Sequence, residues 1–326
     1  MNLKKEFPRI EKIFRYLKLD EIEEVGIMTF LNKDSIFVKG ANDNYIVNVN
    51  ELKNIDNNYF KNKMTKIKSL EYFNDNGIPS IFPIKFNDKY FINYRSREYE
   101  IYKYVNFNHL KYEDLNDKKI KKLANVQAIM HNLNVKLTLP AAYNEIKLNV
   151  DKNLKKVEKY AKEGYKILYE YIYQIDEIIK NYNNNYKYAL NNLILGYDNY
   201  DLNNIEWLKD YMYLADYNNC CLINPSVSLA ESAYFISYND RKIDYERYAL
   251  YLKTYLKKFG PLPYDYKEAL YVSMYKLLAK LEALINRTIK EKVDTSKDIN
   301  EVIKELLVYN LNIEKLYATY IDAVKK

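Results

Sequence analysis

The stretch LILGYDNYDLNNIEWLKDYMYLADY, residues 193–217, decides how the chain is interpreted. An apolar, strand-like start leads into a loop of acidic and amide residues. The members of this loop are Asp198, Asp201, Asn203 and Asn204. Aromatic and apolar residues then lead to an isolated carboxylate, Asp216. In phosphoryl transfer a carboxylate accepts the hydroxyl proton, while an Asn and a second Asp hold Mg²⁺. The stretch therefore raises the question whether it is a phosphate-transfer site, or what remains of one.

The first third of the chain alternates between helical and strand-like patterns. Apolar residues at helical spacing predict helices, and β-rich runs separated by turn residues predict antiparallel strands. The order is helix, hairpin, helix and further strands, at residues 10–17, 36–49, 64–73 and 81–105. Gly77 ends the second helix, and an Asn-Asp pair at 87–88 predicts a turn. Residues up to about 104 thus predict a small antiparallel sheet with one embedded helix.

Helical patterns dominate the rest of the chain. Amphipathic runs with apolar residues on one face lie at residues 117–134, 153–182, 269–291 and 299–326. The stretch at 193–217 interrupts them with short strands. The predicted fold class is therefore α+β, with a small sheet-based part followed by a larger, mainly helical part.

Composition excludes several classes of protein. The 51 basic and 44 acidic residues leave a charge of +7 without a long Lys/Arg run, so no nucleic-acid-binding arm is expected. The cysteines, Cys220 and Cys221, are adjacent, and the histidines, His109 and His131, are too few for a zinc site. No segment has the apolar length of a signal peptide or a membrane span. We expect a soluble protein of the cytoplasm.

The loop and its spacing to Asp216 resemble the aminoglycoside phosphotransferase and choline kinase superfamily, including its choline-kinase-like and spore-coat-kinase-like members. In that family the loop reads His-x-Asp-x-x-x-x-Asn, and a metal-binding Asp follows about a dozen residues later. The resemblance implies a bilobal, protein-kinase-like fold. It makes residues 1–104 the nucleotide-side lobe, and residues 105–326 the lobe with the catalytic loop and the acceptor site. It also implies ATP and Mg²⁺ as cofactors.

Two alignments of the loop with this motif are open. In the first, the strand LIL at 193–195 matches the family's strand. Gly196 then stands at the position of the His, Asp198 is the catalytic base, and Asn203 is the metal ligand that precedes Asp216. This alignment keeps the groups that the chemistry needs.

In the second alignment, NIEW at 204–207 matches the family's Asn-Ile-x-Trp. Tyr197 then replaces the His, Asn199 replaces the catalytic Asp, and Asn204 is the metal ligand. An amide has almost no basicity, so this alignment removes the base and forfeits on the order of 10²–10⁴ in rate.

The nucleotide side also departs from the family's pattern. Asn48 stands where family members carry a Lys that pairs with the phosphates, and Glu71 is not at the expected place of that lysine's acidic partner. The segment GIMTFLNKD, which starts with Gly26, resembles the turn that covers the nucleotide. Ser228 replaces the buried structural Asp. The resemblance assigns Gly26 and Asn48 to cofactor binding, with a positive charge lost at Asn48.

Two hypotheses follow. One is an ATP-dependent kinase for the hydroxyl of choline, ethanolamine or a sugar, with Asp198 as base and Asn203 or Asn204 with Asp216 on Mg²⁺. The other is a pseudokinase, a structural or binding protein such as a spore-coat component, which would have a protein partner. The altered positions favour weak or lost activity.

Overall fold

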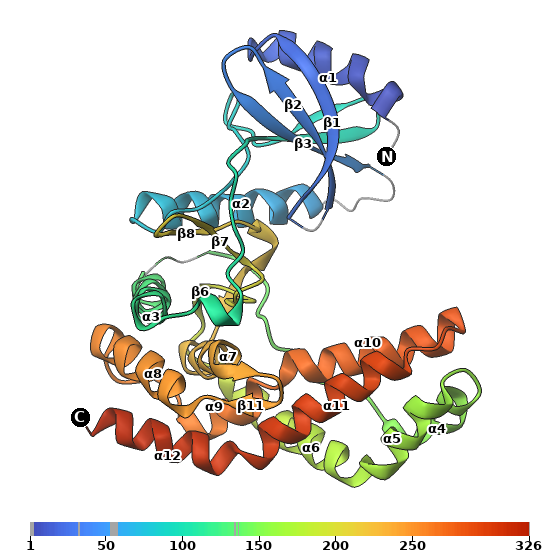
Figure 1. The fold of residues 1–326 in the computed structure, drawn as a ribbon, viewed down its shortest axis with the longest axis vertical. Coiled ribbons are helices and arrows are strands. Elements are labelled where there is room, and N and C mark those ends of the chain that lie inside the picture. The colour runs from blue at the N-terminus through green and yellow to red at the C-terminus, as the bar shows by residue number, and fades with distance from the viewer. Residues whose placement is uncertain (1–2, 32, 53–57, 134, 136, 326) are drawn as a thin grey trace. The chain divides into compact units, whose positions relative to one another are not determined.

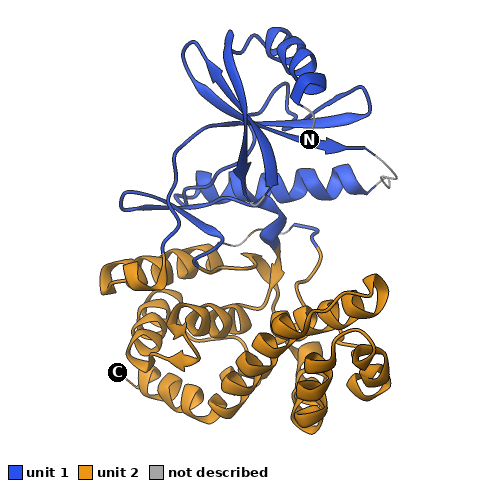
Figure 2. Ribbon diagram, turned by 45° about the vertical axis from the view of Figure 1, so that its right-hand side comes forward, with its two compact units in different colours: residues 1–110, 137–139, 202–220 blue, residues 111–136, 140–201, 221–326 orange. Residues whose placement is uncertain are grey.

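A computed structural model describes residues 3–31, 33–52, 58–133, 135 and 137–325 (Figure 1). The chain forms two compact units, which are coloured separately in Figure 2. Unit 1 comprises residues 1–110, 137–139 and 202–220, and unit 2 comprises residues 111–136, 140–201 and 221–326. Each unit is described by itself. The lobe boundary expected between residues 104 and 105 stays a prediction.

Unit 1 is built on a five-stranded antiparallel sheet with the strand order β1-β2-β3-β5-β4. The strands are β1 Ile22–Phe30, β2 Lys33–Gly40, β3 Asn44–Glu51, β4 Ile92–Tyr94 and β5 Arg97–Lys103. The hairpin predicted at 36–49 is confirmed as β2 and β3, in which Val38 pairs with Tyr45. The sequence did not predict β1, an edge strand with no buried residue and hence no clear alternation of apolar and polar residues.

Two helices cover the sheet of unit 1 (Figure 1). Helix α1, Leu3–Leu17, packs its apolar face against alternate residues of the central strands. The residues of this core include Ile10, Ile13, Phe14, Val38, Val47, Tyr99 and Ile101. Helix α2, Tyr59–Asp75, lies on the opposite face, where its Lys63 contacts Glu98 and Glu100 of β5. Successive residues of a strand point to opposite faces, so β5 serves both helices.

A short ribbon attaches residues 202–220 to unit 1. Strands β7 Ile205–Leu208 and β8 Tyr211–Leu214 pair antiparallel and are followed by the 3₁₀ turn η2, Tyr217–Asn219. Isolated bridges join Asn108 to Trp207 and Ser80 to Leu214. The ribbon therefore belongs to the sheet unit by its contacts, although it follows it by about a hundred residues in the chain.

Unit 2 is mainly helical, as the sequence predicted. Its helices and short strands are the following: η1 Tyr112–Asp114, α3 Asp117–His131, α4 Val150–Glu158, α5 Lys162–Glu170, α6 Ile172–Ala189, β6 Ile194–Tyr197, β9 Cys220–Ile223, α7 Pro225–Ser237, β10 Tyr238–Asn239, β11 Lys242–Ile243, α8 Tyr245–Phe259, α9 Tyr266–Val272, α10 Tyr275–Glu291, α11 Ser296–Leu311 and α12 Ile313–Val324. Strand β6 pairs with β9, whose first residue, Cys220, belongs to unit 1.

Helix α7 forms the centre of unit 2, and nearly all its residues are buried. Its first turn has Pro225 at a position where the missing N–H costs nothing, and the Asn224 side chain accepts a hydrogen bond from the Ser226 N–H at 3.0 Å. Helices α8 and α9 pack against it, and α3 packs against α8. The buried polar groups of α7 therefore need partners inside unit 2.

Candidate functional site

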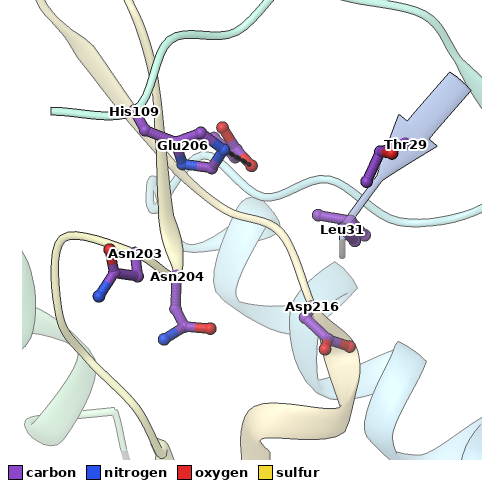
Figure 3. Close-up of a pocket in the computed structure, with 7 residues that line it drawn as sticks. All are labelled: Thr29, Leu31, His109, Asn203, Asn204, Glu206 and Asp216. Atoms are coloured by element: carbon purple, nitrogen blue, oxygen red, sulfur yellow. Dashed lines mark ion pairs between the residues drawn. The ribbon is translucent and has the colours of Figure 1, made fainter. Parts of the chain in front are cut away.

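A pocket in unit 1 is lined mainly by polar side chains (Figure 3). Its lining residues are Thr29, Leu31, His109, Asn203, Asn204, Glu206 and Asp216. Three of the residues predicted as metal ligands, Asn203, Asn204 and Asp216, thus lie in one pocket. They flank the start of β7 and the end of β8, while Thr29 and Leu31 come from the end of β1.

The ribbon explains why these groups meet. Asn204 directly precedes β7, and Asp216 follows β8 by one residue. Since Ile205 pairs with Leu214, the start of one strand and the end of the other share one end of the ribbon. Antiparallel pairing brings such flanking residues together regardless of their separation in sequence. The spacing of twelve positions between Asn204 and Asp216 is therefore the length of a hairpin.

Asp216 also caps the turn that follows it. Its Oδ1 accepts hydrogen bonds from the Asn218 N–H at 2.9 Å and from the Asn218 side-chain amide at 2.8 Å. These bonds orient the half-buried carboxylate at the pocket. Figure 3 displays it together with the amide groups of Asn203 and Asn204. Carboxylate and amide oxygens are hard donors that suit Mg²⁺, so the donor set fits a divalent cation.

Two of the lining residues that were not predicted as site residues, His109 and Glu206, have ionisable side chains. Glu206 is buried, and burial raises the pKa of its carboxyl above the ordinary value, against the opposing effect of His109. His109 Nε2 lies 3.6 Å from Glu206 Oε1, and backbone hydrogen bonds between Asn108 and Trp207 hold this segment beside β7. Glu206 lies two positions after Asn204. Because residues two apart in a strand point to the same face, the strand pattern could have indicated that Glu206 lies on the same side of the ribbon as Asn204.

The two residues assigned to cofactor binding lie elsewhere in unit 1. Gly26 is in the middle of β1, opposite Phe37 of β2, and the turn beyond β1 includes residue 32, outside the described residues. Asn48 is buried on β3 opposite Glu100 and accepts a hydrogen bond from the Ser35 hydroxyl. Neither lines the pocket, and their roles stay predictions.

Asp198, the predicted catalytic base, belongs to unit 2. Its Oδ1 lies 2.8 Å from Lys276 Nζ and accepts a hydrogen bond from the Tyr275 hydroxyl. Lys276 also contacts Glu231, which is buried on α7. Burial raises the pKa of Glu231 to about 8, although Lys276 opposes this shift. An ammonium and a hydroxyl thus already engage the carboxylate of Asp198.

The positions on either side of Asp198 differ in their packing and backbone conformation. A Cβ atom at Gly196 would overlap the side chain of Ile223, so this position has no room for a side chain. Tyr197, its neighbour, is fully buried. Asn199 has a φ of 54°, a left-handed conformation that Asn tolerates better than most residues. Both alignments of the loop stay open.

Ser228, which replaces the family's structural Asp, has a buried partner. The Gln127 side-chain amide donates to the hydroxyls of Ser228 and Ser232, at 3.1 and 2.8 Å. The Tyr251 hydroxyl donates in turn to the Gln127 carbonyl at 2.8 Å. Neutral groups thus satisfy this part of the core without a buried charge.

The architecture and the pocket define the class of the fold, which is the bilobal kinase-like fold of aminoglycoside phosphotransferases and choline kinases. The chain resembles the solved structure of spectinomycin phosphotransferase APH(9)-Ia in complex with ADP and spectinomycin, with a TM-score of 0.65, 12% identity, and coverage of 96% of this chain and 98% of that one. The fold class predicted from the sequence is confirmed.

Two further solved structures support the same fold. A putative aminoglycoside phosphotransferase from Ralstonia eutropha JMP134 has a TM-score of 0.65 and 14% identity, and covers 98% of each chain. Choline kinase from Cryptosporidium parvum Iowa II has a TM-score of 0.55 and 14% identity, with coverage of 98% of this chain and 99% of that one. No protein-family model and no curated protein sequence matches the chain. Across the described residues, no helix combines the length and apolar character needed to cross a membrane.

Proposed function

We propose that this chain is a divergent kinase-fold phosphotransferase that binds Mg²⁺–ATP in the unit 1 pocket and has weak or lost activity toward a small-molecule hydroxyl. The observation that carries the proposal is the convergence of Asn203, Asn204 and Asp216 in one pocket beside the end of β1. Mg²⁺ bound there would offset the negative charge of the nucleotide phosphates. Asp216 would hold the ion through its carboxylate, and Asn203 or Asn204 through its amide oxygen.

The state of Asp198 supports weak activity. Lys276 and Tyr275 both contact Oδ1 of its carboxylate, so an acceptor hydroxyl would compete with them for this oxygen. Asn48 adds a second deficit, because a neutral amide stands where the family carries a Lys. If the acceptor is positioned correctly, loss of base catalysis alone lowers the rate on the order of 10²–10⁴-fold.

The acceptor class follows from the solved structures that share the fold. They include a spectinomycin phosphotransferase, a choline kinase, an aminopropanol kinase and an ethanolamine kinase. We infer a choline-, ethanolamine- or sugar-like alcohol for this chain. A cytoplasmic location is part of this proposal.

A second candidate is a pseudokinase that serves as a structural or binding protein, such as a spore-coat component. The ion pair between Asp198 and Lys276 favours it, because a carboxylate with a structural partner can be retained after catalysis is lost. This candidate predicts a protein partner and no phosphate transfer.

A ligand-induced shift in unfolding temperature tests nucleotide binding. A ligand that binds only the folded state stabilises it by about 2.7 kcal/mol at a hundredfold excess over Kd. We expect Mg²⁺–ATP to raise the unfolding temperature of the wild type and to lose most of this effect in Asp216→Asn. The control is Asp240→Asn, which makes the same charge change in an exposed turn of unit 2. No shift in the folded wild type would exclude nucleotide binding and leave the structural candidate.

A transfer assay separates the two candidates. Labelled γ-phosphate appearing on choline, ethanolamine or a sugar, and lost in Asp198→Asn, would support the kinase. Nucleotide binding without transfer to any acceptor would support the pseudokinase.

A further inference from the structure

A buried ion cluster joins helix α2 to the sheet of unit 1. Lys63 of α2 lies between Glu98 and Glu100 of β5, and their side chains are 4%, 0% and 2% exposed. Hydroxyl groups surround the carboxylates, with Tyr102 donating to Glu100 Oε2 at 2.7 Å. Charged residues are almost never buried unless they are paired, so the cluster is a specific feature of the unit.

The cluster has its basic residue on the helix and its acidic residues on the sheet, which is the reverse of the pair expected from the resemblance. The resemblance places a Lys on the third strand and an acidic residue on the helix. Here the third strand, β3, carries Asn48, which is paired with Glu100 across the sheet, and the helix carries Lys63. The ammonium of Lys63 therefore faces two carboxylates of this unit.

The contacts between Glu100 and Lys63 favour the ionised form of both groups. Burial would raise the pKa of Glu100, but Lys63 and the hydroxyls of Tyr102 and Tyr217 outweigh it and hold this pKa below its ordinary value. Burial would lower the pKa of Lys63, but Glu100 and Glu98 outweigh it and raise this pKa. An ionised Glu100 is a strong hydrogen-bond acceptor with a fixed position.

The same cluster holds the turn that follows Asp216. The Tyr217 hydroxyl donates to Glu100 Oε1 at 2.8 Å, and the Lys63 ammonium lies 5.7 Å from the centre of the Tyr217 ring. One turn along α2, Lys66 Nζ donates to the Asn218 carbonyl at 2.9 Å. Residues three apart share one face of a helix, so α2 anchors the turn at two consecutive residues.

We infer that Glu100 and Lys63, acting through Tyr217, are positioning residues that set the orientation of Asp216 and so the affinity of the pocket for a divalent cation. The inference rests on the proposed function, since it concerns the cation of that site. Neither charged residue lines the pocket. Their contribution is geometric. A metal-binding side chain that is already held in place, here Asp216, loses less conformational freedom when the ion binds.

The test compares two hydroxyl deletions on buried carboxylates. Tyr217→Phe removes the bond to Glu100, and Tyr99→Phe removes a bond of 2.9 Å to the buried Glu6 on the other face of the same sheet. Binding of Mn²⁺–ADP is measured by electron paramagnetic resonance, and stability by urea unfolding. We expect both variants to lose stability, and Tyr217→Phe alone to raise the Kd for Mn²⁺–ADP, by about fivefold.

A double-mutant cycle distinguishes positioning from general loosening. In an Asp216→Asn background, Tyr217→Phe should leave the Kd for Mn²⁺–ADP unchanged, because the group that it orients is already altered. Lys66→Met removes the second anchor at the surface, where folding is not at risk, and should raise the Kd by a smaller factor. This variant keeps the test decisive if Tyr217→Phe does not fold.

Three results would overturn the inference. The first is an unchanged Kd in Tyr217→Phe, or in Lys66→Met if only that variant folds. The second is an equal rise of the Kd in Tyr99→Phe. The third is a full additional effect of Tyr217→Phe in the Asp216→Asn background. If the folded wild type does not bind Mn²⁺–ADP at all, the proposed function fails and the inference falls with it, which distinguishes the two failures.

Discussion

Each unit contains a lysine between two carboxylates, buried in unit 1 and half-buried in unit 2, and the two clusters differ in how their charges are supported. In unit 1, Lys63 lies between Glu98 and Glu100 of one strand. In unit 2, Lys276 lies between Asp198 at a loop and Glu231 on a helix. Both lysines have pKa values raised by their carboxylates against the effect of burial. The pKa values of Glu100 and Glu231, one acidic partner from each cluster, are shifted in opposite directions.

The number of donors around each carboxylate explains the difference. Glu100 accepts bonds from Lys63, Tyr102 and Tyr217, and its pKa is lowered. Burial raises the pKa of Glu231 to about 8, with Lys276 as its opposing partner. At Glu231 the negative charges of Asp198 and Asp201 add to the effect of burial and one ammonium does not offset them, whereas at Glu100 an ammonium and two hydroxyl donors outweigh burial.

The largest expected effect is that of Lys63→Met. It leaves two buried carboxylates without their cation, and breaking a buried pair in this way costs about 3–5 kcal/mol. Lys276→Met is the matched variant, with an expected loss of about 1–2 kcal/mol, because Glu231 can stay protonated and Asp198 is partly exposed. Urea titrations measure the free energy of unfolding, and amide hydrogen exchange assigns each loss to a unit. Equal losses would remove the distinction between the clusters.

A second effect depends on pH. The pKa of Glu231 is about 8 in the folded chain and near its ordinary value when unfolded, so its contribution to stability is complete below the unfolded pKa and is lost as pH rises through 8. Glu231→Gln keeps a neutral side chain, so its stability relative to the wild type should rise by about 2–3 kcal/mol between pH 6 and 8. Unfolding titrations of both proteins at these pH values measure the difference. A constant difference would mean that Glu231 is ionised throughout, like Glu100.

The smallest of these effects concerns His131, a buried imidazole whose pKa is shifted by burial alone. Its Nδ1 lies 2.6 Å from the Tyr255 hydroxyl, and burial lowers its pKa to about 3. The unfolded chain takes up a proton near the ordinary pKa, so stability is lost as pH falls from about 6.5 toward 3. His131→Gln should remove about 2 kcal/mol of this loss between pH 6.5 and 5, as measured by urea unfolding. The same acid sensitivity in both proteins would contradict the assignment.

Local patterns predicted most of the fold. The helices at 10–17 and 64–73 and the strands of the first hairpin have apolar residues at clear spacing, and they are present as α1, α2, β2 and β3. Strand β1 was missed because an edge strand that buries neither face needs no alternation. Local sequence patterns could not predict that the β7–β8 ribbon belongs to unit 1, because this depends on bridges to Asn108 and Ser80, which are far away in the sequence.

The candidate site was predicted in part. Asn203, Asn204 and Asp216 follow from motif spacing, and they share one pocket. The partners of Asp198 did not follow, because Lys276 lies on a helix 78 positions later, within an ordinary amphipathic pattern. The pairing of Lys63 with Glu98 and Glu100 could not be predicted either. The alternation of these two acidic residues with apolar residues is also typical of a strand with one face exposed to solvent. Long-range pairs of charges leave no periodic signal in a sequence.

The crowding at Gly196 bears on whether the chain could regain a lost residue. In the first alignment of the loop, this position corresponds to the family's His, yet the volume that a side chain would need is filled by the buried Ile223. Reversion by a single substitution would create a clash in the core, so a His at 196 would require a smaller residue at 223 at the same time. In that alignment, restoring the His requires two simultaneous substitutions, so the packing of the core disfavours its return by single mutations.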